Sequence, residues 1–494
     1  MQVAPDATVE PRTPYWRNFW IIASGLIVMR IATLIATPLG IGPDEAQYWF
    51  WSRDIAFGYF SKPPMIAWAI ALTTAFFGSA DWAVRLSAPL FHVGAAAFLF
   101  LCARRLFDAR TGFWVGVSWL LMPGVVLSSF VMATDAPLLF FWCGALYFLV
   151  RIWFDEETSI INFAALGAMI GLGLMSKYAM IYFPIALVAM LFVSAQRELL
   201  LRPALLITGL VTAAIFAPNV FWNSQHDFHT LSHTAANAHW GAGLFKPVSL
   251  VEFLGGQFAV FGLIAFTALV LFLWRAPKHI GDRRFIFLLV FAMTPLLIVA
   301  GQAFLSRAHA NWAAAAYPAA TLLVVGFLLA HEKMLLVKAN AAFHAFLFGV
   351  FTLGVISPVM IDRVGLSSAA MDLRGWKTQT DEIMHFAADY DAVLIDDRYL
   401  MGEMLYHQRD ADPPLMAIDP NASIDNHYEA FLAFDPKNAK RVLFVTTRND
   451  ASHVDYRFRE IKHLGSVSAS PEGDERTYTL FAISDYFGPD AGVP

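Results

Sequence analysis

Long runs of apolar residues, separated by short polar segments, dominate the chain up to about residue 360. A bilayer core about 30 Å thick needs about 20 apolar residues of helix to cross it. The pattern therefore predicts an α-helical polytopic membrane protein. It contains eleven candidate spans, the last ending near Met360, which begin near Phe19, Ala83, Gly112, Asp135, Ile160, Ala179, Pro203, Phe253, Phe285, Trp312 and Ala339.

The pattern changes after Met360, where charged residues recur throughout and apolar runs become short. Three runs have the length and composition of strands, at residues 392–395, 441–445 and 477–481. The segment Gly375–Tyr390 has helical spacing of its apolar residues. We therefore expect a cytoplasmic tail at residues 1–16, a transmembrane domain at 17–360 and a small α/β domain at 361–494.

Loop charge predicts the orientation of the spans. If the N-terminus is cytoplasmic and eleven spans alternate, basic residues such as Arg104, Arg105, Arg283 and Arg284 fall in cytoplasmic loops. Such an excess of Lys and Arg is typical of the cytoplasmic side. The polar outer loops and the C-terminal domain are then expected on the periplasmic side of a bacterial inner membrane.

Composition supports a membrane environment and excludes some classes of function. Hydrophobic residues make up 58% of the 494 residues and charged residues only 15%, and the mean hydropathy is +0.55. A chain with so few polar residues cannot form the polar surface that a soluble protein needs. The formal charge of −5 argues against a nucleic-acid partner, and the chain has no Gly-rich nucleotide-binding motif. Membrane lipids are the expected surroundings.

The predicted outer loops carry polar residues that a membrane anchor does not need. Charged side chains at the edge of membrane helices are costly and often mark functional sites. Their gathering on one side predicts chemistry at the outer leaflet. The candidates are Asp44, Glu45, Tyr48, Tyr59, Lys62, Asp135, Lys177, His226, Arg307, His309, Asn311 and Trp312.

The acids Asp44, Glu45 and Asp135 allow two interpretations. Each lies at the expected start of a helix, where an acidic side chain caps the first turn and interacts with the helix dipole. Each could instead take part in acid–base catalysis, with Asp44 as the base that deprotonates a hydroxyl.

The cations Lys62, Lys177 and Arg307 also allow two interpretations. Lys62 precedes Pro63-Pro64, which fixes the backbone and prevents helical continuation there. A rigid lysine near the membrane surface is suited to bind a lipid phosphate as a point charge. The alternative for each is a long side chain that extends to the interface.

The spacing His226-x-x-His229-x-x-x-His233 places three imidazoles on one face of the segment if it is helical. A divalent metal site is one interpretation. Ordinary hydrogen-bonding histidines are the other, because no carboxylate ligand accompanies them at a matched spacing. The sequence therefore does not predict a metal or another cofactor.

The outer-loop residues together resemble the GT-C superfamily of glycosyltransferases, in its bacterial branch of protein O-mannosyltransferase-like enzymes. That branch includes aminoarabinose transferases of lipid A and galacturonosyltransferases of lipopolysaccharide. The resemblance covers residues 15–360 and implies that Asp44 is the catalytic aspartate with Glu45 beside it. It further implies that Lys62 of the Lys-Pro-Pro turn faces the donor phosphate, and that Asp135 and Lys177 match the second-loop aspartate and the lysine after the fifth span.

Two local features refine the resemblance. The stretch Arg307–Trp312, with the sequence Arg-Ala-His-Ala-Asn-Trp, is similar to a motif before a late span in many members. Aminoarabinose transferases have a Glu before Lys-Pro-Pro, and this chain has Ser61. That departure argues against aminoarabinose and against a metal. The runs Asp-Glu-x-x-Tyr-Trp at 44–49 and Arg-x-His-x-Asn-Trp at 307–312 resemble instead the branch with uronic acid or neutral hexose donors.

The resemblance implies a polyprenyl-phosphate sugar donor, a lipid A or lipopolysaccharide acceptor and an inverting displacement at the outer face of the membrane. Two alternatives stay open. A lipid or polysaccharide transporter also contains intramembrane charges and broken helices. A receptor or assembly factor would use the C-terminal domain to bind a partner.

Overall fold

The computed structural model describes residues 14–193, 202–236, 244–276, 279, 281–365, 367–410, 412–419, 421, 424–437, 439–469 and 476–488. Most of the predicted tail at 1–16 lies outside these residues. The chain divides into two compact units. The first unit consists of Met1–Ile35, Lys62–Ile66 and Arg85–Phe351, and the second of Ala36–Ser61, Ala67–Val84 and Thr352–Pro494.

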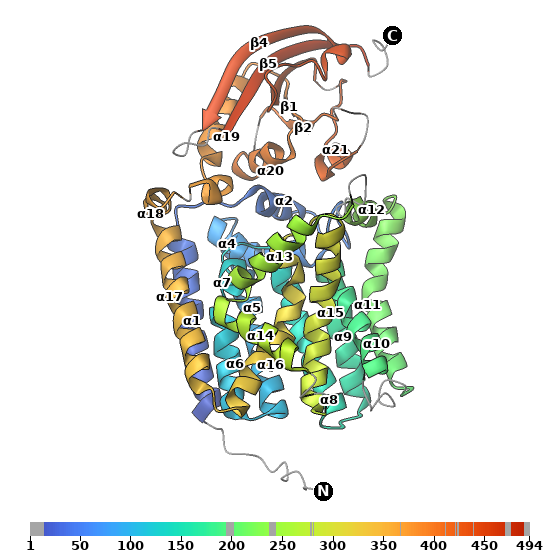
Figure 1. Ribbon diagram of the computed structural model, residues 1–494. Coiled ribbons are helices and arrows are strands. Elements are labelled where there is room, and N and C mark those ends of the chain that lie inside the picture. The colour runs from blue at the N-terminus through green and yellow to red at the C-terminus, as the bar shows by residue number, and fades with distance from the viewer. Residues whose placement is uncertain are drawn as a thin grey trace. The chain divides into compact units, whose positions relative to one another are not determined.

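The first unit is helical, and its helices run side by side in Figure 1. Apolar helices satisfy their own backbone hydrogen bonds, which is why they form in a lipid environment. Its elements are α1 (Pro14–Ala36), α5 (Ser87–Leu106), α6 (Ala109–Leu121), α7 (Pro123–Ser128), α8 (Asp135–Trp153), α9 (Ile160–Ser176), η1 (Tyr178–Ile181), α10 (Tyr182–Val193), α11 (Leu205–Gln225), α12 (His229–Ala236), α13 (Pro247–Val260), α14 (Leu263–Arg275), α15 (Arg283–Leu305), η4 (Ala310–Ala316), α16 (Tyr317–Ala330) and α17 (Met334–Ile356), whose last residues belong to the second unit.

Each of the eleven predicted apolar runs coincides with a helix. Within the described residues, seven helices are long and apolar enough to cross a membrane, and α13 with α14 forms an eighth candidate. That pair bends by 120° at Gly262, whose φ is +98° and which the His344 ring approaches closely. The helical content is confirmed, whereas the number of crossings stays a prediction.

Helices α9 and α11 pack closely in the first unit. The Thr208 hydroxyl donates to the Phe163 carbonyl at 2.9 Å, and the Thr212 hydroxyl donates to the Gly167 carbonyl at 3.0 Å. These contacts join two helices without leaving a buried hydroxyl unpaired, which would be costly. They fix the axis of α9, which ends directly before Lys177.

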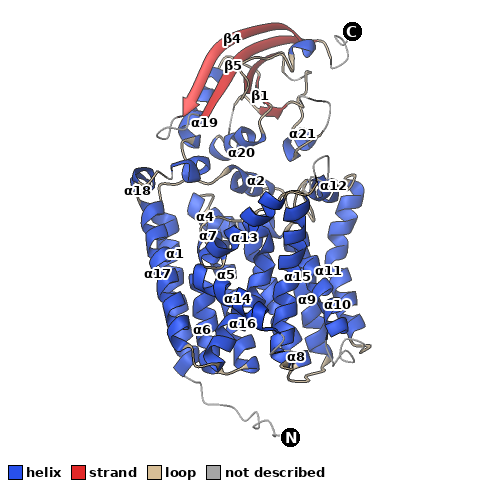
Figure 2. Cartoon of the chain, viewed as in Figure 1, coloured by secondary structure: helices blue, strands red, loops and turns tan. Residues whose placement is uncertain are grey.

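The second unit contains a five-stranded sheet of order β2-β1-β3-β5-β4. Strand β1 pairs in parallel with β2 and β3, while β5 pairs antiparallel with β3 and β4. Figure 2 shows the strands in red, with helices α19 and α20 against the sheet. The elements are α2 (Pro43–Trp51), α3 (Met65–Phe77), α4 (Asp81–Arg85), α18 (Pro358–Arg363), η5 (Ser367–Leu373), α19 (Trp376–Ala387), β1 (Ala392–Ile395), α20 (Arg398–His407), β2 (Leu415–Ala417), α21 (His427–Phe431), β3 (Arg441–Thr446), η6 (Asp455–Arg457), β4 (Phe458–Ala469) and β5 (Arg476–Tyr486).

The three predicted strands and the predicted helix are confirmed as β1, β3, β5 and α19. The sequence did not predict β2, β4 or α20. Strand β4 is an edge strand with mostly exposed or half-buried residues, so it lacks an apolar run. Strand β2 has only three residues, which is too short to produce a pattern.

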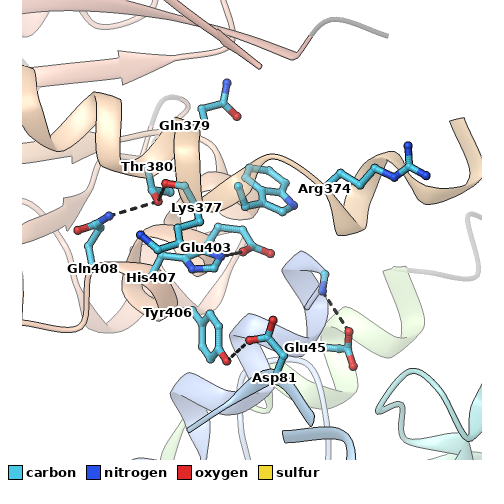
Figure 3. Close-up of polar contacts among 12 residues, drawn as sticks. Glu45, Asp81, Arg374, Lys377, Gln379, Thr380, Glu403, Tyr406, His407 and Gln408 are labelled. Carbon is cyan, nitrogen blue, oxygen red and sulfur yellow. Dashed lines mark hydrogen bonds and ion pairs between the residues drawn. The ribbon is translucent and has the colours of Figure 1, made fainter. Parts of the chain in front are cut away.

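The second unit also includes the first polar loop of the chain. Helix α2 packs against α20, where the Trp49 and Tyr406 rings meet edge to face at 5.0 Å. Tyr406 also donates its hydroxyl hydrogen to the Asp81 carboxylate at 2.6 Å (Figure 3). The predicted domain boundaries at 16/17 and 360/361 stay predictions.

Candidate functional site

The two acids of the first loop have different environments in α2. Gly42 is the N-cap and Pro43 the first helical residue, a position that suits its fixed φ. The buried Glu45 carboxylate turns back and accepts the Gly42 N–H at 3.1 Å (Figure 3). Asp44 is exposed. The capping interpretation therefore applies to Glu45.

Asp44 contacts an arginine that the sequence interpretation did not single out. Arg398, the first residue of α20, donates from Nη2 to Asp44 Oδ1 at 3.1 Å and from Nη1 to Gln47 Oε1 at 3.0 Å. Burial is the largest single influence on Arg398 and acts to lower its pKa, but the Asp44 carboxylate and Tyr399 together outweigh it, and the pKa of Arg398 is raised. The sequence analysis missed Arg398 because it did not predict α20, and only within that helix is a cation in the first turn recognisable as unfavourable against the helix dipole.

The tyrosines of the first loop build its structure. Tyr59 stacks on Trp51 with ring centroids 4.9 Å apart, and its hydroxyl contacts the Trp51 and Asp54 carbonyls at 3.0 and 2.8 Å. Burial raises the pKa of Tyr59 to about 12. Tyr48 is also buried, with its ring 5.3 Å from that of Trp51. Their predicted contact with substrate stays a prediction.

In the first unit, three candidates from three separate segments come together. Lys177 Nζ donates to Asp135 Oδ1 at 2.7 Å, and Asn311 Nδ2 donates to Asp135 Oδ2 at 3.2 Å. Only 11% of the Asp135 side chain and 23% of the Lys177 side chain are exposed. Water screens a charge pair of this burial less than it screens an exposed pair, so the attraction between the two charges is stronger.

The local backbone explains this arrangement. Asp135 is the first residue of α8, and Lys177 follows α9 in an extended conformation with φ −161° and ψ 135°. Asn311 lies in the 3-10 helix η4. The Asp135 carboxylate contacts Lys177 and Asn311, whereas the N-cap position of α8 is occupied by Thr134.

Lys62 and Arg307 lie in non-helical segments of the first unit, as the sequence indicated. Lys62 is half-buried in a bend directly before α3, and Arg307 is exposed between α15 and η4. The Arg307 carbonyl accepts from Gln302 Nε2 at 3.3 Å. Nearby, the His309 and Trp312 rings meet edge to face at 5.3 Å. Their predicted roles stay predictions.

The histidines of the fourth loop do not lie on one helix. His226 is in a turn before α12, where its ring stacks on Trp222 at 4.0 Å and Nδ1 contacts the Trp222 carbonyl at 2.8 Å. His229 is the first residue of α12. Among the described residues, no group of three or more His, Cys, Asp or Glu side chains is arranged to hold a metal ion.

Comparison with known proteins shows which enzymes the chain resembles. Residues 61–222 match the family model described as dolichyl-phosphate-mannose-protein mannosyltransferase. The chain is 32% identical over 443 residues to the lipid A galacturonosyltransferase RgtD of Rhizobium johnstonii. The match covers 87% of this chain and 91% of that protein.

Solved structures show the same fold. The crystal structure of ArnT from Cupriavidus metallidurans in the apo state has a TM-score of 0.65 and 17% identity, over 95% of this chain and 98% of that chain. The same protein bound to undecaprenyl phosphate has a TM-score of 0.64 and 16% identity, over 96% and 98%. The chain is therefore a multi-pass membrane protein with a small C-terminal sheet domain, as predicted.

Proposed function

We propose that this chain, which belongs to the family of membrane glycosyltransferases that includes the lipid A galacturonosyltransferase RgtD, transfers galacturonic acid to a lipid A-type acceptor. The donor is a polyprenyl-phosphate sugar. The observation that carries the proposal is the match to RgtD along 91% of that protein. The family and the GT-C fold agree with the resemblance noted in the sequence.

The proposed reaction is a single inverting displacement at the anomeric carbon. The acceptor hydroxyl oxygen forms a bond to that carbon while the bond from the carbon to the phosphate oxygen breaks. Asp44 takes the proton of the hydroxyl, a role that suits an exposed carboxylate better than the capping carboxylate of Glu45. The products are the glycosylated acceptor and polyprenyl phosphate.

Cations stabilise the phosphate as it leaves, since negative charge gathers on its oxygens. Lys62, Lys177 and Arg307 are the proposed groups. The Lys177 ammonium is already oriented by Asp135, so it needs little rearrangement to bind an anion. Asp135, held in turn by Asn311, is proposed to keep Lys177 in place and to orient a sugar hydroxyl.

The proposed location is the bacterial inner membrane, with Asp44 and the C-terminal domain on the periplasmic side. The concentration of basic residues in the predicted cytoplasmic loops supports this orientation. Donor and acceptor are both lipids, so they would enter from the bilayer.

The proposal is tested with purified protein in lipid vesicles that contain polyprenyl-phosphate galacturonate and a lipid A acceptor. The mass of the acceptor and the release of polyprenyl phosphate are measured for wild type, Asp44→Asn and Asp54→Asn. Asp54 is an exposed acid of the same loop and serves as the matched control. We expect wild type and Asp54→Asn to add the mass of one galacturonate to the acceptor. Asp44→Asn should lower the rate of this transfer by about 100-fold or more.

Other outcomes contradict specific parts of the proposal. A mass gain that survives Asp44→Asn removes the base role of Asp44. Transfer of mannose but not galacturonate replaces the uronate with a neutral hexose. If no sugar from a wide donor panel is transferred and no polyprenyl phosphate is released, the transporter alternative gains support.

A further inference from the structure

Arg398 occupies a position that local helix energetics disfavour. It is the first residue of α20, with Asp397 as N-cap accepting the Leu400 N–H at 2.8 Å. The partial positive charge of a helix N-terminus repels a cation there. Since this location does not help the helix to form, the contacts of the guanidinium are the place to look for its role.

Contacts other than the Arg398–Asp44 pair also hold α2 against α20. Gly402 brings the two helices close together, because a Cβ there would meet the Pro43 carbonyl oxygen at 3.3 Å. The Trp49 and Tyr406 rings meet at 5.0 Å. A partly exposed ion pair adds little to a buried interface of this kind.

The guanidinium is oriented but not enclosed. Gln47, which is 4% exposed, fixes Nη1 from the buried side of α2. The Arg398 side chain is 39% exposed and that of Asp44 62%. A guanidinium has five N–H donors in a planar fork. Gln47, Asp44 and the neighbouring Tyr399, whose ring centroid lies 4.5 Å from the guanidinium carbon, engage part of this fork and leave N–H donors for a planar anion.

We propose that Arg398, oriented by Gln47, binds the carboxylate of the uronic acid and thereby selects a charged donor sugar over a neutral one. This inference rests on the proposed function. A guanidinium matches a carboxylate in two parallel hydrogen bonds. Asp44 becomes neutral when it takes the proton of the acceptor hydroxyl. The sugar carboxylate is then the remaining anion beside Arg398.

The experiment compares two donors with the same polyprenyl phosphate: galacturonate and its uncharged C6 carboxamide. Each is measured as a substrate and as a competitor of the other, with wild type, Arg398→Gln, Arg398→Lys and Lys377→Gln. The Lys377 side chain is 72% exposed, so Lys377→Gln is the control for removal of a surface charge. All variants are compared after their thermal unfolding has been checked.

We expect Arg398→Gln to lower kcat/KM for the galacturonate donor by about 10- to 100-fold, because a hydrogen bond to a charged group typically contributes this much to binding. The carboxamide should change by less than about 3-fold as substrate or competitor, since it does not need a cation. Arg398→Lys should recover part of the preference, because it keeps the charge without the fork. Lys377→Gln should leave the preference unchanged.

An equal loss on both donors overturns the inference and assigns Arg398 to the shared phosphate, to the acceptor or to the positioning of Asp44. An unchanged preference in Arg398→Gln, or an equal change in Lys377→Gln, also overturns it. If wild type transfers neither donor, the proposed function itself fails, and the inference fails with it.

Discussion

The Lys177 ammonium lies 2.7 Å from the Asp135 carboxylate, although the two residues are 42 positions apart in the chain. Asn311 contacts the other oxygen of the same carboxylate from a position 176 residues later. The carboxylate therefore orients a lysine on one side and an amide on the other. Removal of Lys177 would leave the largely buried Asp135 carboxylate without its ionic partner, and removal of Asp135 would do the same to Lys177.

Removal of both members of this pair should destabilise the protein less than the two single removals added together. Asp135→Asn or Lys177→Met alone leaves a largely buried charge and is expected to cost about 1–3 kcal/mol. The double variant should cost less than the sum of the single variants by about 0.5–3 kcal/mol. Thermal unfolding in detergent measures the three variants, and strict additivity would contradict a direct interaction.

Lys62→Gln should weaken use of the polyprenyl-phosphate donor. Loss of a charge-assisted contact to the phosphate is expected to lower kcat/KM for the donor by about 10- to 100-fold. Lys62→Arg should retain part of the activity, since it keeps the charge. Lys338→Gln, an exposed lysine of α17, is the matched control. Equal donor kinetics in Lys62→Gln and wild type would show that Lys62 does not bind the phosphate.

Gly402→Ala should separate α2 from α20. The added Cβ would lie 2.9 Å from the hydroxyl oxygen of buried Tyr428 and 3.3 Å from the Pro43 carbonyl, and overpacking of this kind costs about 1–3 kcal/mol. The variant should unfold at a lower temperature and lose transferase activity, because Asp44 and Arg398 lie on these two helices. Gly349→Ala in α17 meets no atom within 4 Å and should not lower the unfolding temperature.

The second unit should lose stability in acid because of His427. Its ring is packed among Phe50, Trp51 and Phe431, and burial lowers the pKa of His427 from 6.5 to about 3. The unfolded chain therefore binds a proton between these values that the folded chain does not. The contribution of His427 to the free energy of unfolding should be fully present above pH 6.5. It should fall by about 1.4 kcal/mol per pH unit as the pH drops toward 3.

Hydrogen exchange of the segment around α21, measured between pH 7 and pH 4 and corrected for intrinsic exchange, checks this prediction. His427→Phe should flatten the pH dependence, leaving a smaller decline from His407, whose pKa burial also lowers. An unchanged pH dependence in His427→Phe would show that another group controls the acid response.

The sequence alone was sufficient to predict the apolar helices of the first unit, helix α19 and three strands. Each of these features depends on the immediate surroundings of single residues. An apolar run of about 20 residues forms a helix in lipid whatever its neighbours are. Central strands such as β1 are buried on both faces, so their residues are uniformly apolar. An exposed edge strand such as β4 has no such requirement and was missed.

Only the tertiary structure decided which side chains meet. Two acids adjacent in sequence separate into Glu45, which caps α2, and Asp44, which contacts Arg398 354 positions away. Asp135 looked like a helix cap and instead pairs with Lys177. Hydrophobicity and turn residues determine local structure one segment at a time, whereas a distance between two side chains depends on how whole helices pack. That information is distributed over every residue of both interfaces, and no local pattern contains it.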